Sequence, residues 1–143
     1  MTVKFRILGS GEWGLAIANH LAQQNYSVEI FGRTKSKIDK LKQNRECKYL
    51  NVKFDENTSF DYLSDISKKE FSKSIHNIIA TSSSGFADLI NENRTYLSKY
   101  SNFIWLTKGL DKKSNKFFDE LLTDYFGTSI NCCLISGPSF AKD

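Results

Sequence analysis

Short apolar runs alternate along the chain with longer segments in which apolar residues recur every three or four positions. The runs cover residues 3–8, 28–31, 75–81, 103–106 and 132–135, and a further short strand is expected at 52–54 or 58–60. The other segments predict helices, because residues three and four apart share one helix face. The alternation therefore predicts an α/β fold: a doubly wound, mainly parallel sheet with helices on both faces.

Helical segments are expected to begin near residues 13, 37, 61, 86 and 117. Ser36 is expected to cap the second of them. The last helix has an apolar stripe that should face the sheet, consisting of Phe117, Phe118, Leu121, Leu122 and Tyr125. Predicted helices and strands alternate over the whole length of the chain. The sequence contains no internal repeat.

A glycine-rich turn joins the first predicted strand to the first predicted helix, with the sequence Gly9-Ser10-Gly11-Glu12-Trp13-Gly14. This is the order G-x-G-x-x-G that binds dinucleotides between a strand and a helix. Gly9 permits the tight turn, Gly11 lets backbone approach a diphosphate, and Gly14 lets the helix lie against the sheet. The helix start offers N–H groups and a partial positive charge to the phosphates.

The end of the second predicted strand bears on which dinucleotide is bound. In NAD-selective sites a carboxylate at this point accepts hydrogen bonds from the adenosine ribose. Arg33 occurs here instead, followed by Lys35 and Lys37. A guanidinium pairs well with a ribose 2′-phosphate, which favours NADP(H) while leaving NAD(H) open. The alternative is that these basic residues only form a solvated strand exit.

Composition and charge narrow the class of protein. The 143 residues suit one domain, and a hydrophobic content of 40% with 25% charged residues is typical of a globular protein. A net charge of +4 without alternating basic and aromatic residues favours anionic small ligands over nucleic acid. Three cysteines give no metal-ligand spacing, and Cys132 and Cys133 are expected to be buried thiols in a strand. Neither a signal peptide nor a membrane-spanning run is seen, so a cytoplasmic protein without membrane insertion is expected.

Two later strand exits also carry residues suited to anion binding. Lys108 follows the fifth predicted strand, and Gly137, Pro138 and Ser139 follow the sixth. Ligands of doubly wound sheets bind outside the carboxyl ends of the strands, where these residues are expected. From the residues alone, Lys108 suits a phosphate contact and an exposed surface lysine equally, and Ser139 suits a turn.

Four stretches together resemble the amino-terminal domain of bacterial NAD(P)-dependent glycerol-3-phosphate dehydrogenases. They are the glycine turn, Phe31-Gly32-Arg33, the stretch from Trp105 to Leu110 with Thr107-Lys108-Gly109, and Ser136-Gly137-Pro138-Ser139-Phe140-Ala141-Lys142. The resemblance implies NAD(P)H-dependent reduction of dihydroxyacetone phosphate to sn-glycerol 3-phosphate for phospholipid synthesis. It also implies a Rossmann-type sheet and a homodimer for the full-length protein.

The resemblance assigns roles residue by residue. Cofactor contacts are implied for Gly9, Ser10, Gly11, Glu12, Trp13, Gly14, Arg33, Lys108 and Ala141, and substrate contacts for Lys108, Gly137 and Ser139. Glu12 departs from the small residue usual in the family, and a carboxylate beside a diphosphate is unfavourable unless it turns away. No metal is implied.

Length is the larger departure, because members of that family are about twice as long. Their helical second domain carries the lysine that serves as general acid and base, so no catalytic residue is assigned within residues 1–143. The chain is therefore expected to be the dinucleotide-binding domain, incomplete at its C-terminal end and inactive alone. A stand-alone dinucleotide-binding module without catalysis is the alternative.

Overall fold

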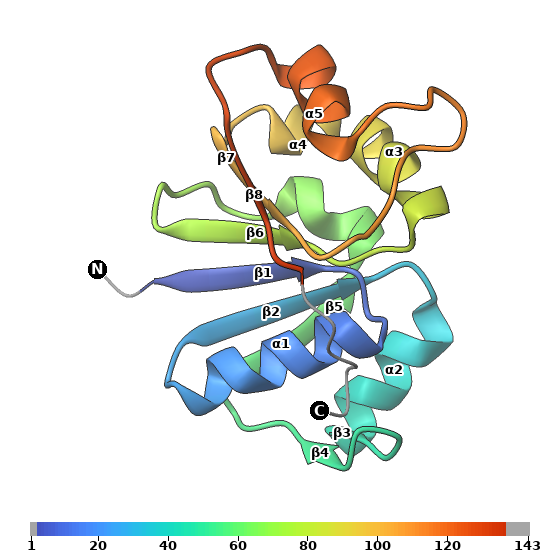
Figure 1. The fold of residues 1–143 in the computed structure, drawn as a ribbon. Helices are drawn as coiled ribbons and strands as arrows, with labels where there is room; N and C mark the ends of the chain where they lie inside the picture. Colours follow the sequence, from blue (N-terminus) through green and yellow to red (C-terminus); the bar gives the residue numbers. More distant parts are fainter. Residues whose placement is uncertain (1–2, 137–143) are drawn as a thin grey trace.

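The structure is a computed structural model that describes residues 3–136. Six strands form one sheet in the order β5-β2-β1-β6-β7-β8 (Figure 1), and every neighbouring pair in it is parallel. The strands are β1 (Lys4–Leu8), β2 (Ser27–Gly32), β5 (Thr58–Tyr62), β6 (Ile75–Ile79), β7 (Asn102–Trp105) and β8 (Asn131–Leu134). A separate antiparallel pair consists of β3 (Glu46–Cys47) and β4 (Val52–Lys53). Both segments proposed for the third strand are thus extended, but only the second joins the main sheet.

Helices cover both faces of this sheet, as predicted. They are α1 (Glu12–Gln23), α2 (Lys35–Asn44), the 3-10 helix η1 (Leu63–Lys68), α3 (Ser83–Glu92), α4 (Arg94–Leu97) and α5 (Phe118–Phe126). Helices α1 and α2 pack on one face, and η1, α3, α4 and α5 pack on the other (Figure 1). The doubly wound α/β prediction is confirmed.

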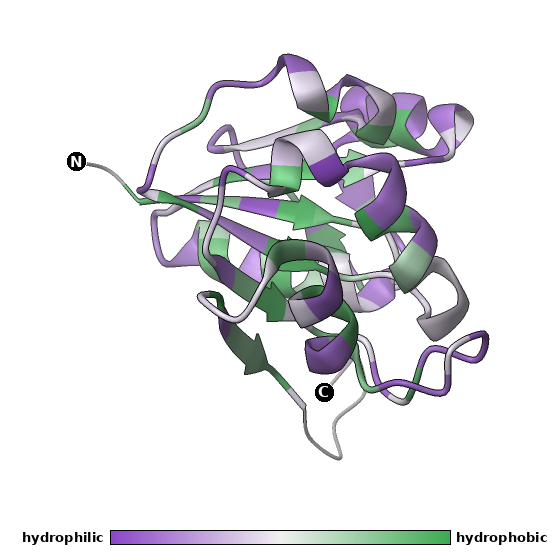
Figure 2. Cartoon of the chain, turned by 90° about the horizontal axis from the view of Figure 1, so that it is seen from above, coloured by the Kyte–Doolittle hydropathy of each residue, from purple (hydrophilic) through white to green (hydrophobic). Residues whose placement is uncertain are grey.

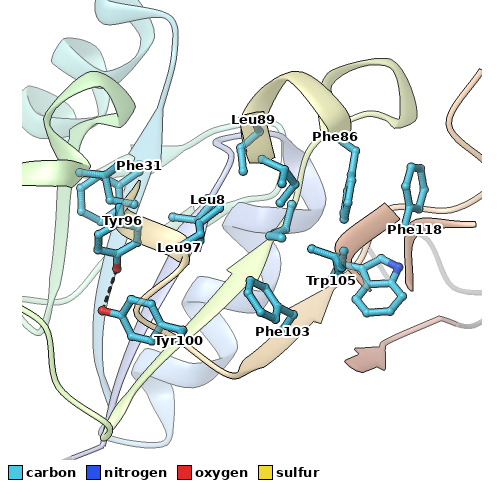
Figure 3. Close-up of a cluster of buried hydrophobic side chains, with 14 of the residues drawn as sticks. Leu8, Phe31, Phe86, Leu89, Tyr96, Leu97, Tyr100, Phe103, Trp105 and Phe118 are labelled. Atoms are coloured by element: carbon cyan, nitrogen blue, oxygen red, sulfur yellow. Dashed lines mark hydrogen bonds between the residues drawn. The ribbon is translucent and has the colours of Figure 1, made fainter. Parts of the chain in front are cut away.

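Alternate residues of the central strands feed two separate cores. Ile7 packs with the α1 and α2 residues, whereas its neighbour Leu8 packs with the α3, α4 and α5 residues. Figure 3 shows the second core, in which the Phe86 and Phe118 rings stack with their centroids 4.1 Å apart. Strands buried on both faces are rich in apolar residues, which is why the sequence pattern located them although each contains two polar residues. Figure 2 shows the hydrophobic strands inside and the hydrophilic residues on the outer parts of the helices.

The five helix starts lie one to three residues from those expected, and α3 differs most, because it begins at Ser83 rather than near residue 86. Helix α2 begins at Lys35 because the carbonyl of Thr34 already accepts hydrogen bonds from the N–H groups of Lys37 and Ile38, so Ser36 is not the cap. Phe117 is 61% exposed and does not join the apolar stripe. It precedes α5 in an extended conformation, and its N–H donates to the Glu120 carboxylate at 2.8 Å.

The expectation of buried thiols is wrong. Cys132 and Cys133 are exposed, as are all four residues of β8. Within residues 3–136, this strand lies at the edge of the sheet and pairs with β7 alone. An apolar run reports the tendency of residues to be buried, but the elements packed on the strand decide whether they are, since β5 also lies at an edge and buries Thr58 and Phe60.

A buried arginine connects the middles of three neighbouring strands. Arg6 of β1 is fully buried and lies directly beside Glu29 of β2 and Asn77 of β6 in the sheet register. Its Nε lies 2.5 Å from Glu29 Oε2, and its Nη1 donates to the Tyr96 hydroxyl at 2.9 Å. That hydroxyl donates in turn to Asn77 Oδ1 at 2.8 Å, and burial raises the pKa of Tyr96. The arrangement gives the Arg6 charge direct partners on β2 and α4, and it connects Arg6 to β6 through the Tyr96 hydroxyl.

Candidate functional site

The glycine turn after β1 is shaped by close contact with the exit of β6. Gly9 has φ +131° and its N–H donates to the Phe31 carbonyl at 2.8 Å. A Cβ at this position would lie 2.3 Å from the carbonyl oxygen of Ala80. Only glycine fits both the backbone conformation and the space, so the predicted tight turn is present.

Helix α1 starts directly above this turn with an open end. Gly11 occupies the N-cap position, no side chain caps the helix, and a Cβ on Gly11 would meet nothing within 4 Å. The first N–H groups of a helix have no acceptor inside it, so they can bind an anion. Gly14 lies underneath, where a Cβ would be 2.5 Å from the Gly9 carbonyl oxygen and 3.3 Å from the Ile7 side chain. Gly14 is therefore a packing residue, and Gly11 borders open space.

Three cavities follow one another along the carboxyl ends of the strands. The loop cavity, of about 240 Å³, is lined by Gly9, Ser10, Gly11 and Arg33. It shares Arg33 and Leu63 with a second cavity of about 460 Å³, called here the Arg33 cavity. On its other side it shares Ala80, Thr81 and Ser82 with a third, of about 340 Å³, called here the Lys108 cavity. The three form one groove, called here the carboxyl-edge groove.

The topology explains why the groove lies at this place. The chain leaves β1 on one side to form β2 and returns on the other side to form β6. Connections that diverge from adjacent parallel strands leave a crevice at their carboxyl ends, which is the usual ligand site of doubly wound sheets. The loop cavity lies in this crevice, between the β1 and β6 exits.

Arg33 forms one wall of the groove and reaches across it. Its Nη2 lies 3.2 Å from Oε2 of Glu92, the last residue of α3, and the two side chains are 45% and 60% exposed. The pair borders the Arg33 cavity together with Lys35 and Tyr96. A cation at the end of β2 is thus present, with a carboxylate beside it.

Lys108 lies at the opposite end of the groove with Trp13. Both line the Lys108 cavity, and the preceding residue, Thr107, is buried. The Thr107 hydroxyl donates to the Thr81 carbonyl at 2.8 Å, which joins the exits of β7 and β6. This hydrogen bond holds the Lys108 backbone next to the wall of the groove.

Nearly the whole chain matches one known protein family. Residues 4–143 match the family described as NAD-dependent glycerol-3-phosphate dehydrogenase N-terminus. The chain belongs to this family. The NAD(P)+ glycerol-3-phosphate dehydrogenase of Bartonella tribocorum is 32% identical over 145 residues, which cover 99% of this chain and 42% of that protein. That of Wigglesworthia glossinidia brevipalpis is 33% identical over 139 residues, with 95% and 41% covered.

A solved structure agrees with the family assignment at the level of the fold. The crystal structure of glycerol-3-phosphate dehydrogenase from Coxiella burnetii superposes with a TM-score of 0.84 at 23% identity, covering 99% of this chain and 42% of that one. The chain therefore spans less than half the length of the relatives it matches. Within residues 3–136, no helix is long and apolar enough to cross a membrane, and no group of three or more His, Cys, Asp or Glu side chains is placed to hold a metal ion.

The site residues named from the sequence of this family member fall into three groups. Gly9, Ser10, Gly11 and Arg33 meet at the loop cavity, and Trp13 and Lys108 meet at the Lys108 cavity. Glu12 lines a different cavity with Lys37 and Lys40, on the α2 side of α1. Glu12 thus borders a cavity that two lysines also line, and it does not line the loop cavity. Three further predicted contact residues lie outside the described residues: Gly137, Ser139 and Ala141.

Other lining residues were not singled out from the sequence. Thr81 and Ser82 border two of the cavities, Leu63 borders two, and Glu92 borders one. Thr81 ends a predicted buried strand and Ser82 follows it directly, and this position at a strand exit is a usable signal for a site in a doubly wound sheet. Glu92 and Leu63 carry no local signal, because only the tertiary arrangement brings α3 and η1 to the groove.

The loop that follows Lys108 is held by Asp111, which yields a pH-dependent prediction. Asp111 Oδ2 accepts hydrogen bonds from the Ser114 hydroxyl at 2.6 Å and the Ser114 N–H at 2.8 Å, and these bonds lower the pKa of Asp111. We expect Asp111→Ala to lower the free energy of unfolding by about 1.5 kcal/mol near pH 7. A carboxyl with a lowered folded-state pKa stabilises above its unfolded value and loses that contribution as pH falls through the folded one. Urea unfolding should therefore show a constant difference from wild type between pH 5 and 7 that shrinks below roughly pH 4. A difference that stayed constant to pH 2.5 would contradict this account.

Proposed function

We propose that the chain binds NADP(H) or NAD(H) along the carboxyl-edge groove and forms the cofactor site of a glycerol-3-phosphate dehydrogenase. The observation that carries the proposal is the line of three cavities with the glycine turn in the middle. The order suits adenosine in the Arg33 cavity, the diphosphate in the loop cavity and the nicotinamide in the Lys108 cavity. Family membership favours this function over a non-catalytic binding module.

The residues present fit a dinucleotide. Open space beside Gly11 and the uncapped start of α1 suit a diphosphate. Thr81 lines two of the cavities, and its buried Oγ1 has no hydrogen-bond partner among residues 3–136, so a polar ligand group could supply one. Arg33 would hold the adenosine end, where a guanidinium suits a 2′-phosphate and gives the preference for NADP(H). When bound, the dinucleotide supplies or accepts a hydride.

Lys108 and the segment after β8 would hold the substrate. The proposed substrates are dihydroxyacetone phosphate and sn-glycerol 3-phosphate, whose phosphate suits the Lys108 ammonium as a point charge. Gly137 and Ser139 are proposed as further contacts. Reduction of a ketone also needs an acid for the forming alkoxide, and none is assigned within this chain. Homodimer formation and a cytoplasmic location stay predictions.

Titration with NADPH and NADH tests the proposal. We expect both to quench the fluorescence of Trp13, which lines the Lys108 cavity, with NADPH binding more tightly. Arg33→Asp should weaken NADPH binding by about 10- to 100-fold, because it removes a charged hydrogen-bond donor and adds a like charge, while NADH binding changes little.

A control assigns the signal to one of the two tryptophans. Trp13→Phe should abolish the quenching, because Trp105 is only 5% exposed and lies in the core on the other face. Calorimetry on the same variants gives affinities that do not depend on fluorescence. Absence of binding by wild type would overturn the proposed function, and an unchanged affinity ratio in Arg33→Asp would overturn the role of Arg33.

A further inference from the structure

Arg33 and Glu92 form a pair of opposite charges at one end of the proposed dinucleotide site. They are 59 residues apart in the sequence, and their side chains meet at 3.2 Å beside the Arg33 cavity. Dinucleotide sites often have a carboxylate at the end of the second strand, where this chain has Arg33. Here a carboxylate from the end of α3 meets the tip of the Arg33 side chain beside the Arg33 cavity.

We propose that Glu92 is a specificity-determining residue that weakens binding of NADP(H) relative to NAD(H). The inference rests on the proposed function, since it assigns a role within the same groove. Arg33 favours a ribose 2′-phosphate, and Glu92 opposes it. The ratio of the two affinities then depends on both side chains.

The opposition has two physical causes. A phosphate monoester carries a charge of about −1.5 to −2 near pH 7, so a carboxylate a few ångströms away repels it. The guanidinium Nη2 that points to Glu92 is also one of the donors that a bidentate phosphate contact would use. Binding of a 2′-phosphate must therefore displace the Glu92 carboxylate or leave it beside the phosphate.

The Glu92 carboxylate favours a ribose that lacks the 2′-phosphate. Its 2′- and 3′-hydroxyls are donors, and a carboxylate accepts hydrogen bonds from them. Arg33 holds the Glu92 side chain at the cavity, which limits the conformations that must be ordered when a hydroxyl binds. Glu92 thus supplies to NAD(H) the kind of contact that the end of β2 lacks.

Glu92→Gln tests the inference, because it removes the charge and keeps the size of the side chain. Binding of NADPH and NADH to the purified chain is measured by calorimetry. We expect the ratio of NADPH to NADH affinity to rise about tenfold, a modest factor because both side chains are partly exposed. Raising the salt concentration should reduce this change.

Asp88→Asn is the matched control. Asp88 lies one turn earlier on α3 and pairs with Lys113 at 3.6 Å, but it does not line the Arg33 cavity. The Asp88→Asn change removes the same charge from α3 as Glu92→Gln does. Its affinity ratio should stay close to that of wild type. An unchanged ratio in Glu92→Gln, or an equal rise in Asp88→Asn, would overturn the role of Glu92 while leaving the proposed function standing. Failure of wild type and Glu92→Gln to bind either dinucleotide would overturn both.

Discussion

Arg6→Met is expected to lower the free energy of unfolding by about 3–5 kcal/mol, the range seen when one member of a buried ion pair is removed. The guanidinium is fully buried, and its loss leaves the Glu29 carboxylate without its nearest cation, because Lys4 lies 3.7 Å away rather than 2.5 Å. It also removes the donor to the Tyr96 hydroxyl. Urea unfolding followed by circular dichroism measures the change.

Two further variants separate this cause from a simple loss of packing. Glu29→Gln added to Arg6→Met should recover part of the lost stability, because a half-buried amide is less costly than a carboxylate that keeps only the more distant Lys4 as its cation. Arg94→Met removes an exposed arginine that donates to the Tyr125 carbonyl at 3.4 Å, and its effect should stay below about 1 kcal/mol. A double variant no more stable than Arg6→Met alone would show that the unpaired carboxylate is not the cause.

The sheet could be predicted from the sequence because its central strands are buried on both faces. Residues 28–31 and 75–79 are each mostly apolar, and in the structure both lie beside β1. The parallel order followed from the helical segments between them, since a helix connecting two strands of one sheet makes them parallel. Local pattern and global fold agree in this part of the chain.

The edge of the sheet and the helix starts could not be predicted in the same way. The Cys132-Cys133 run has the composition of a buried strand, yet all four residues of β8 are exposed, because within residues 3–136 none of its side chains joins either of the two cores. Phe117 has the spacing of a core residue, but α5 begins after it. In both cases the local sequence has the composition or spacing of a buried element. Whether its side chains are buried depends on other segments of the chain that pack against it.

The candidate site also contains residues that could be predicted from the sequence and residues that could not. The glycine turn and Lys108 carry local motifs, so the sequence placed them at strand exits that the structure brings to one groove. Glu92 and Leu63 come from helices whose position depends on the whole fold. Tyr96 connects the site with the core, because it lines the Arg33 cavity and also accepts a hydrogen bond from the buried Arg6. Loss of Arg6 should therefore disturb that end of the groove as well as the core.

Gly9→Ala is expected to lower the free energy of unfolding by about 4 kcal/mol, combining backbone strain with overpacking. Alanine is strained at φ +131°, and its Cβ would lie 2.3 Å from the Ala80 carbonyl oxygen. The nearest atoms that the new Cβ meets belong to the Ala80 backbone and not to a flexible side chain, so relief of this contact must move the glycine turn away from the β6 exit. We therefore expect the variant that remains folded to bind NADPH at least tenfold more weakly, measured by calorimetry below its unfolding temperature.

Gly11→Ala makes the same chemical change two residues later and separates stability from binding. Gly11 has φ −72°, and an added Cβ meets nothing within 4 Å, so the free energy of unfolding should fall by no more than about 1 kcal/mol. The methyl group borders the loop cavity, where the diphosphate is proposed, and should still weaken NADPH binding about tenfold through a lost close backbone approach. If Gly11→Ala bound NADPH as tightly as wild type, the diphosphate would not lie against this turn. If Gly9→Ala were as stable as Gly11→Ala, the contact with Ala80 would not constrain the turn.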